Sequence, residues 1–512
     1  MRHPAQPTPA HEDSVVAALR SPRILRREVL AGLVVALALI PEAISFSILA
    51  GVDPRVGLFA SFTMAVSIAF LGGRPAMITG ATGAIALVIG PVAAKYGLDY
   101  LLATVILGGV LQVVFGLLGT AQLMRLLPRS VMVGFVNALA ILIFIAQLPQ
   151  LGLDTHGGLH IVGVPWMVFP LVALGIVILV FLPRLTTVVP APLVVIVVIT
   201  ALVLAGGIDV PNVSGEGELP RSLPSMLIPD VPFTLETLQI IAPYAFAMAM
   251  VGLLESLMTA KLVDDITDTH SNKSRESWGQ GAANVITGFF GGMGGCAMIG
   301  QTIINVKGSG ARTRISTFLA GVFLLILVVG FGDIVGKIPM AALVAVMIIV
   351  SVGTFDWHSI SPANLKRMPK SETLVMLTTV VFVVVTHNLA IGVVAGVILA
   401  FMLFARRIYH LVGVDRELIE EADGTAYARY TVTGELFFAS SNDLVYQFNY
   451  AEDPERVVID LSQSHVWDAS TVAALDGIET KYNRKDKSVQ IVGLNEASSH
   501  MHERLTGQLP SH

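Results

Sequence analysis

Long apolar stretches, separated by short polar or proline- and glycine-containing breaks, run through residues 28–410. A helix needs about 20 mostly apolar residues to cross a bilayer, and on that criterion the region divides into about fourteen spans. The predicted spans are 28–50, 56–72, 76–94, 99–124, 130–150, 164–183, 187–206, 236–260, 276–291, 297–306, 314–331, 338–353, 372–386 and 388–406. The third, ninth and tenth are short or interrupted by glycine. The pattern predicts a polytopic α-helical membrane protein.

Composition supports this prediction. Of the 512 residues, 54% are hydrophobic and 13% are charged, and the mean hydropathy is +0.74. Such values exclude a soluble enzyme for most of the chain, and we expect neither catalysis nor a cofactor. The single cysteine, Cys296, excludes an intrachain disulfide and is interpreted as a small packing residue, and no histidine has metal-ligand spacing.

The distribution of basic residues predicts the orientation. An even number of spans places both termini on one side of the membrane. With the N-terminus inside, Arg55, Lys95, Arg221 and Lys337 are the basic residues on outer segments, whereas inner segments carry nineteen. This asymmetry follows the positive-inside rule and predicts that both termini are cytoplasmic. The basic run 20–27 leads into more than twenty apolar residues without a cleavage-like site, which indicates a first span rather than a signal peptide.

The last part of the chain has a different character. Charge density rises from about one residue in ten to about one in four at residue 414, and the tail has a net charge of −9. Predicted strands at 425–438, 456–462 and 488–494 alternate with predicted helices at 443–450 and 471–482, as in a small α/β domain. We therefore predict three parts: a cytoplasmic segment (1–27), a transmembrane domain (28–413) and an acidic domain (414–512) that does not bind nucleic acid.

Two carboxyl groups lie within predicted spans, Glu42 in the first and Glu255 in the eighth. An ionisable group at membrane depth is costly and indicates an ion or substrate pathway; the alternative is a protonated structural carboxyl bonded to a neighbouring helix. Residues 74–93 and 289–314 are rich in Gly, Ala and Thr. This composition is typical of helices interrupted at mid-membrane, or, alternatively, of close helix packing.

Spacing relates these features. Glu42 and Glu255 are 213 residues apart, and Gly80 and Met298, near the starts of the two glycine-rich segments, are 218 apart. Two halves of seven spans, an odd number, must be inverted relative to each other, as in many transporters. The N-termini of two facing half-helices would present unpaired N–H groups and form an anion site without arginine.

These residues resemble the SulP family of anion transporters, to which prestin belongs. The stretches that carry the resemblance are IPEAISFSILAGVDPRVGLFAS (40–61), ITGATGAIALVIGPVA (78–93), GLLESLMTAKLVDD (252–265), QGAANVITGFFGG (280–292) and INVKGSGARTRIS (304–316). The tail resembles a STAS domain, because VVIDLSQSHVWDASTVAALDG (457–477) matches the segment in which related domains carry a phosphorylatable serine, here Ser470. Ser470 is interpreted either as a phosphorylation site or as a helix N-cap.

The resemblance implies fourteen spans in two inverted repeats, with a core domain (spans 1–4 and 8–11) that moves against a gate domain (spans 5–7 and 12–14). Family members are often dimers and carry chloride, sulfate, bicarbonate, oxalate or C4-dicarboxylates, and the STAS domain implies a possible cytosolic partner. Carried over by position, the substrate site comprises Glu42, Phe46, Gly80, Ala81, Thr82, Glu255, Thr259, Met298, Ile299, Gly300 and Gln301. Ala81 replaces a proline of prestin-like members, Gln301 an arginine of many members, and Glu42 a glutamine common in animal proteins.

Two carboxylates without a neighbouring Lys or Arg would repel an anion, so a cation must accompany the substrate. We expect this cation to be a proton on Glu42, which makes the protein a proton-coupled symporter of a small anion, either a C4-dicarboxylate such as fumarate or bicarbonate. Na⁺ held by Glu255 and Thr259, which lie on one helix face, is the alternative and would make a Na⁺-coupled bicarbonate symporter. The sequence is also compatible with an uncoupled exchanger or channel, and with a receptor that signals through its tail.

Overall fold

The computed structural model describes residues 14–119, 128–154, 160–161, 163–185, 190–386, 388–409, 412–421 and 425–506. Residues 1–13 of the predicted cytoplasmic segment and 507–512 of the predicted tail domain lie outside these ranges. The chain separates into two compact units, Met1–Val397 and Ile398–His512. This separation falls inside the last membrane helix, whereas the change in charge density predicts a domain boundary at residue 413.

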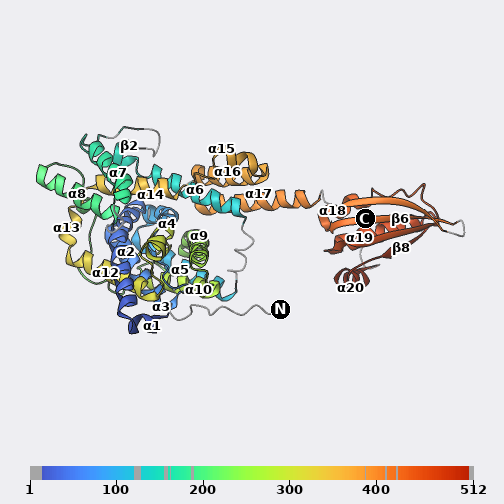
Figure 1. The fold of residues 1–512 in the computed structure, drawn as a ribbon, viewed down its shortest axis with the longest axis horizontal. Helices are drawn as coiled ribbons and strands as arrows, with labels where there is room; N and C mark the ends of the chain where they lie inside the picture. The colour runs from blue at the N-terminus through green and yellow to red at the C-terminus, as the bar shows by residue number, and fades with distance from the viewer. Residues whose placement is uncertain are drawn as a thin grey trace. The chain divides into compact units, whose positions relative to one another are not determined.

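Every predicted span overlaps a helix, and all of these helices but α17, which continues into the second unit, lie within the first unit (Figure 1). The span helices are α2 (Pro22–Leu49), α3 (Pro54–Leu71), α4 (Gly83–Tyr96), α5 (Leu98–Leu117), α6 (Arg129–Ile145), α7 (Val168–Leu185), α8 (Ala191–Gly206), α9 (Leu235–Thr267), α10 (Lys273–Phe289), α11 (Ile299–Ile303), α12 (Arg314–Gly330), α14 (Met340–Thr354), α16 (Lys370–Thr386) and α17 (Leu389–Tyr409). Shorter elements connect them: α1 (Val15–Arg20), η2 (Pro149–Leu151), β2 (Leu153–Asp154), β3 (His160–Ile161), η3 (Val213–Gly215), α13 (Gly332–Gly336) and α15 (Pro362–Arg367). Among the described residues, seven helices are long and apolar enough to cross a membrane alone.

Helix packing follows the symmetry of two repeats. If each span corresponds to the span seven places later, the contact between α3 and α12 corresponds to that between α10 and α5, and both are present. The contacts of α2 with α12 and of α9 with α5 form a second such pair, and those of α6 with α16 and of α14 with α7 a third. Where α5 crosses α10, a Cβ on Gly109 would lie 2.7 Å from the Gly281 carbonyl oxygen, so glycine lets the two backbones approach closely.

The two glycine-rich segments meet in the interior of this unit. Strands β1 (Thr79–Gly80) and β4 (Cys296–Ala297) pair antiparallel, and α4 and α11 begin within three residues of them. A Cβ on Gly295 would lie 2.0 Å from the Gly80 carbonyl oxygen, so only glycine fits at this crossing. The third and tenth spans are therefore a strand followed by a half-helix, and α11 continues directly into a π-helical turn, η4 (Ile304–Gly308).

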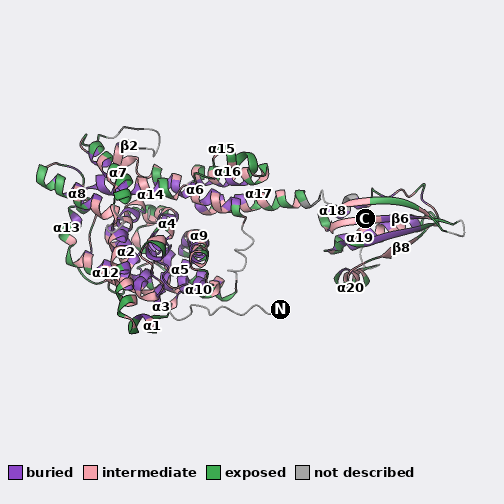
Figure 2. Ribbon diagram, in the orientation of Figure 1, coloured by how far each residue is buried: buried purple, intermediate pink, exposed green. Residues whose placement is uncertain are grey.

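Burial separates the interior helices from the periphery (Figure 2). The largest cluster of buried apolar side chains draws on α2, α4 and α14. Along α17, exposed and half-buried side chains prevail, and 17% of its most apolar window is buried. An apolar helix with this little protein contact suits a lipid-facing position.

The second unit contains a four-stranded sheet in the order β5-β6-β7-β8. Its strands are β5 (Gly413–Glu420), β6 (Ala426–Leu436), β7 (Arg456–Val466) and β8 (Ser488–Val492), and its helices are α18 (Phe438–Leu444), α19 (Ala469–Asn483) and α20 (Glu496–Leu505). β5 is antiparallel to β6, and the other pairs are parallel. The three predicted strands and the helix at 471–482 are confirmed, whereas β5 and α20 were not predicted.

The predicted helix at 443–450 is wrong, because α18 ends at Leu444. The following residues instead place aromatic rings into the core: the Phe448 ring lies 4.5 Å from that of Tyr430, and the Tyr450 ring 4.7 Å from that of Tyr482. Core packing therefore overrides the local helical pattern in this segment.

An ion pair joins β6 and β7. Arg429 donates a hydrogen bond to the buried carboxylate of Asp460, and the Ser462 backbone N–H donates to the same carboxylate at 2.9 Å. Hydrogen bonding by Ser462 and Arg429 lowers the pKa of Asp460 to about 2. The native state of this sheet therefore favours the ionised carboxylate.

Candidate functional site

Glu42 lies on α2 directly after Pro41. A hydrogen bond links its carboxylate, in the first repeat, to a side chain of the second repeat. The Gln301 side-chain nitrogen, Nε2, donates a hydrogen bond of 2.9 Å to Glu42 Oε1. Gln301 is buried, Glu42 is half-buried, and Gln301 Oε1 has no hydrogen-bond partner among the described residues. Phe46, one turn after Glu42, is buried against the start of α4, where a Cβ on Gly83 would lie 2.9 Å from its ring.

The start of α4 is tightly enclosed. Gly80, Ala81 and Thr82 are all buried. The Ala81 backbone N–H donates to Ser61 Oγ at 3.2 Å, and Thr82 is the N-cap of α4, accepting a bond from the Ile85 N–H at 3.4 Å. Two of the N–H groups near this helix start are therefore satisfied by side chains of the protein.

The start of α11 is more open. Met298 is its N-cap residue and makes no side-chain cap bond, Ile299 is half-buried, and Gly300 is exposed. A Cβ on Gly300 would meet no atom within 4 Å. Free space therefore adjoins the N-terminus of α11, one residue before the Gln301 that holds Glu42.

Glu255 belongs to an enclosed chain of hydrogen bonds. The Cys296 thiol donates to Glu255 Oε2 at 2.8 Å and lies 3.0 Å from the Thr82 hydroxyl. Cys296 is thus buried, as expected of a packing residue, but it also links the eighth span to the cap of α4. The Thr259 hydroxyl donates to the Glu255 backbone carbonyl at 2.8 Å, one turn back on the same helix.

The predicted site residues therefore fall into two groups around the β1–β4 crossing. Glu42, Gln301 and the start of α11 form one, and Glu255, Cys296 and the start of α4, against which Phe46 packs, form the other. Thr259 is fully buried and bonds to its own helix backbone. Ser470 lies in the second unit and belongs to neither group.

Sequence reasoning missed the residues that fix the crossing. Asn284 on α10 accepts a hydrogen bond from the Gly295 N–H at 2.8 Å and donates to the Gly295 carbonyl at 3.0 Å, and Gln280 donates to the same carbonyl at 3.1 Å. The Ala297 N–H donates to Ser256 Oγ at 3.1 Å. The available signal was two amides four residues apart within the ninth predicted span.

Within the described residues, no group of three or more His, Cys, Asp or Glu side chains is arranged to hold a metal ion. The oxygen atoms proposed for Na⁺, on Glu255 and Thr259, already take part in the bonds described above.

Ser470 is exposed and is the second residue of α19. The N-cap interpretation of Ser470 is wrong: Asp468 is the N-cap, and its Oδ1 accepts a bond from the Thr471 N–H at 3.0 Å. A carboxylate caps this helix better than a serine one residue into its first turn. The Ser470 hydroxyl is not needed for the cap.

Together, the fold and the site define a helical membrane transporter built from two inverted repeats that meet at a pair of half-helices. A sequence model of the sulfate permease family matches residues 25–379, and one of the STAS domain matches residues 419–507. The chain therefore belongs to the sulfate permease family and carries a C-terminal STAS domain, as its motifs indicate, and it is an anion transporter rather than an enzyme.

Relatives and solved structures agree with this assignment. The putative sulfate transporter YbaR of Bacillus subtilis is 52% identical over 481 residues, which cover 94% of this chain and 97% of the relative. The bicarbonate transporter BicA of a Picosynechococcus species is 27% identical, with coverage of 92% and 89%. The transmembrane domain of a cyanobacterial BicA matches with a TM-score of 0.63 and 25% identity, over 73% of this chain and 98% of that one. SLC26A9 matches with a TM-score of 0.78 over 96% of this chain and 88% of that one; at 17% identity, this likeness shows the fold alone.

Proposed function

We propose that this protein carries a small anion together with a proton by alternating access, and that Glu42 holds the proton. The observation that supports the proposal is the Glu42–Gln301 hydrogen bond beside the open start of α11. An anion bound at that helix start would lie close to the Glu42 carboxyl. Because like charges repel strongly where water is scarce, the anion and the ionised carboxylate would disfavour each other, and protonation removes the repulsion.

Gln301 suits a carboxyl group that changes its protonation state. In the structure its amide nitrogen donates to Glu42 Oε1, a bond that an ionised carboxylate accepts well. If the Gln301 side-chain amide flipped by 180°, its oxygen would face Glu42 and could accept a hydrogen bond from the protonated carboxyl. An arginine in place of Gln301 would hold Glu42 ionised in every state, so the neutral amide supports coupling to protons.

Coupling to Na⁺ has less support. The Thr259 hydroxyl is directed to the backbone of its own helix, and the Glu255 carboxylate is bonded by Cys296. A Na⁺ ion there would have to reach two side chains that are buried and already hydrogen-bonded. For the substrate, we propose bicarbonate or a C4-dicarboxylate such as fumarate. The bicarbonate transporters among the relatives support the first, and the putative sulfate transporters make sulfate the necessary comparison.

The test is uptake of labelled bicarbonate, fumarate and sulfate into liposomes containing the purified protein, with imposed gradients of protons or of Na⁺. We expect saturable uptake of one anion that an inward proton gradient accelerates. Glu42→Gln should abolish the acceleration while the protein stays folded. Glu372→Gln, which neutralises an exposed carboxylate in the first turn of α16, is the matched control. Acceleration that persists unchanged in Glu42→Gln would refute the proton assignment, and flux insensitive to both cations would favour an exchanger or a channel.

We further propose that the protein is a homodimer in the plasma membrane with both termini in the cytoplasm. We keep 28–413 as the transport domain and 414–512 as the STAS domain, with Ser470 as a phosphorylation site that controls binding of a cytosolic partner. The exposed position of Ser470 supports this role. Phosphorylation that occurs in cells and changes uptake in wild type but not in Ser470→Ala would support it, and unchanged uptake would contradict it.

A further inference from the structure

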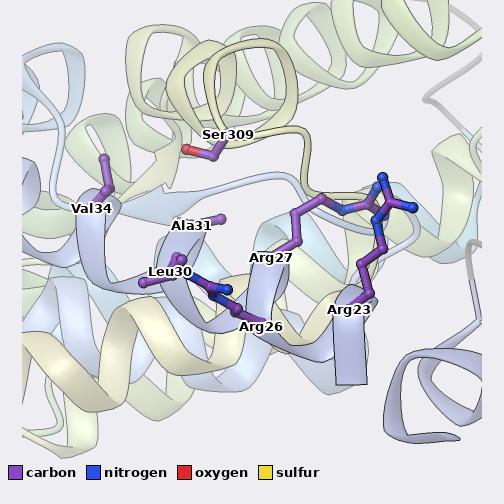
Figure 3. A pocket seen from close by; sticks show the side chains of 7 residues that line it. All are labelled: Arg23, Arg26, Arg27, Leu30, Ala31, Val34 and Ser309. Carbon is purple, nitrogen blue, oxygen red and sulfur yellow. The ribbon is translucent and has the colours of Figure 1, made fainter. Parts of the chain in front are cut away.

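A pocket of about 380 Å³ lies beside the first turns of α2 and shares no residue with the site around Glu42. Three arginines, Arg23, Arg26 and Arg27, line it from α2, and Ser309 lines it from another segment; in Figure 3 the head groups of Arg23 and Arg27 extend to the same side, and that of Arg26 points toward Leu30. Leu30 and Val34 continue the same wall. The lining is therefore strongly basic at one end and apolar at the other.

Helical spacing produces this division. Arg23, Arg27, Leu30 and Val34 follow one another at intervals of three or four residues, so they form one stripe along α2. The apolar run of the first span begins at Val29, directly after the arginines and Glu28. Leu30 is 50% exposed although it lies within this run. The stripe thus passes from a charged segment into the membrane, with its apolar part accessible from outside the protein.

The arginines lack a counter-charge. Within the described ranges, none of the three forms an ion pair with a carboxylate. The carboxylate of neighbouring Glu28 is buried and committed elsewhere, because it accepts bonds from the Arg312 N–H at 2.8 Å and from the Thr313 hydroxyl at 2.9 Å. Like charges four residues apart on a helix repel each other. A bound anion would therefore stabilise this cluster.

Arg27 indicates what kind of anion fits. Its Nε and Nη2 atoms are buried and have no hydrogen-bond partner within the part of the chain that the structure describes. These two donors form the side of the guanidinium that binds two oxygens of one phosphate or carboxylate group. Buried donors without a partner are costly, so rotation of this side chain toward a pocket ligand that supplies two oxygens would be favourable.

We infer that this pocket binds the phosphate headgroup of an anionic glycerophospholipid, with an acyl chain along Leu30 and Val34. Basic residues directly before a membrane span are suited to anionic lipids. A water-soluble phosphate would satisfy the arginines but would gain nothing from the exposed apolar stripe. The apolar end therefore favours the lipid over a free phosphate.

The test titrates the full-length protein, purified in detergent, with phosphatidylglycerol, phosphatidylcholine or glycerol 3-phosphate. Binding is followed by native mass spectrometry and by the melting temperature. We expect phosphatidylglycerol to bind in preference to the other two. Arg27→Gln should weaken its binding by roughly tenfold and Arg27→Lys by less, because lysine keeps the charge but loses the two-donor geometry.

Two further variants separate the possible outcomes. Arg406→Gln removes an exposed arginine from the last turn of α17 and should change lipid binding by less than about twofold. Leu30→Asn should weaken binding of phosphatidylglycerol but not of glycerol 3-phosphate. Equal binding of the two phospholipids, or equal effects of Arg27→Gln and Arg406→Gln, would overturn the site. Glycerol 3-phosphate binding as tightly as phosphatidylglycerol would overturn the assignment to a lipid.

Discussion

A single methyl group at the strand crossing should disable transport. Gly295→Ala places a Cβ 2.0 Å from the Gly80 carbonyl oxygen, 2.6 Å from the Gly80 carbonyl carbon and 3.1 Å from the Ala81 nitrogen. All three atoms are backbone atoms, so no side chain can rotate away to make room. The strands β1 and β4, and with them the starts of α4 and α11, must move apart.

The structure sets the size of the effect. Real Cβ contacts are essentially never shorter than 3.0 Å, so the Gly80 carbonyl has to move by about 1 Å. Overpacking of a tightly packed interior typically costs about 1–3 kcal/mol. A misplacement of this size in a site that positions reacting groups can reduce rates by about a hundredfold. We therefore expect Gly295→Ala to melt a few degrees lower and to transport at least about tenfold more slowly than wild type.

The assay combines proteoliposome uptake with thermal unfolding of the purified protein. Gly353→Ala is the matched control, because a Cβ on Gly353, near the end of α14, meets no atom within 4 Å. This control should transport at the wild-type rate and melt at the same temperature or slightly higher. If Gly295→Ala transports and melts like Gly353→Ala, the close approach of β1 and β4 is needed neither for transport nor for stability.

Three further predictions concern the supporting residues. Asn284→Ala removes two bonds to the Gly295 backbone and should lower the free energy of unfolding by about 2–4 kcal/mol; a change below about 0.5 kcal/mol in denaturant titrations would contradict this. Cys296→Ser keeps a donor to Glu255 and should transport at close to the wild-type rate, whereas Cys296→Ala should transport roughly tenfold more slowly. Equal uptake rates for the two variants would show that the bond to Glu255 is unimportant. The ionised form of Asp460 stabilises the STAS sheet above its unfolded pKa near 4, and this stabilisation should be lost as the pH falls through its folded pKa of about 2. Hydrogen exchange of β6 and β7 in the full-length protein should show the loss between about pH 4 and pH 2 in wild type but not in Asp460→Asn, and identical profiles would contradict it.

The spans and the two interrupted segments could be predicted because both depend on local composition. Apolar runs of span length and clusters of glycine are visible without knowledge of tertiary contacts, and the inverted relation follows from an odd number of spans. The partners of the two carboxyl groups could not be predicted. Gln301 is 259 residues from Glu42, and Cys296 is 41 residues from Glu255, so each pair forms only because the interrupted segments cross. Asn284 resembles a packing residue in the sequence, and its role depends on the backbone position of Gly295.

The two membrane carboxyl groups occupy equivalent places in the repeats but differ in their surroundings. Glu42 is half-buried beside the free space at Gly300, and its partner is an amide that can bond either protonation state. Glu255 is 8% exposed and is enclosed by Cys296, which also contacts the cap of α4. Proton exchange needs access to water, so this asymmetry supports the proposal that Glu42 carries the proton and that Glu255 has a positioning role. Glu255→Gln should therefore lower the uptake rate but keep its acceleration by a proton gradient, whereas Glu42→Gln should lose that acceleration. If Glu255→Gln alone abolishes the acceleration, the two roles are reversed.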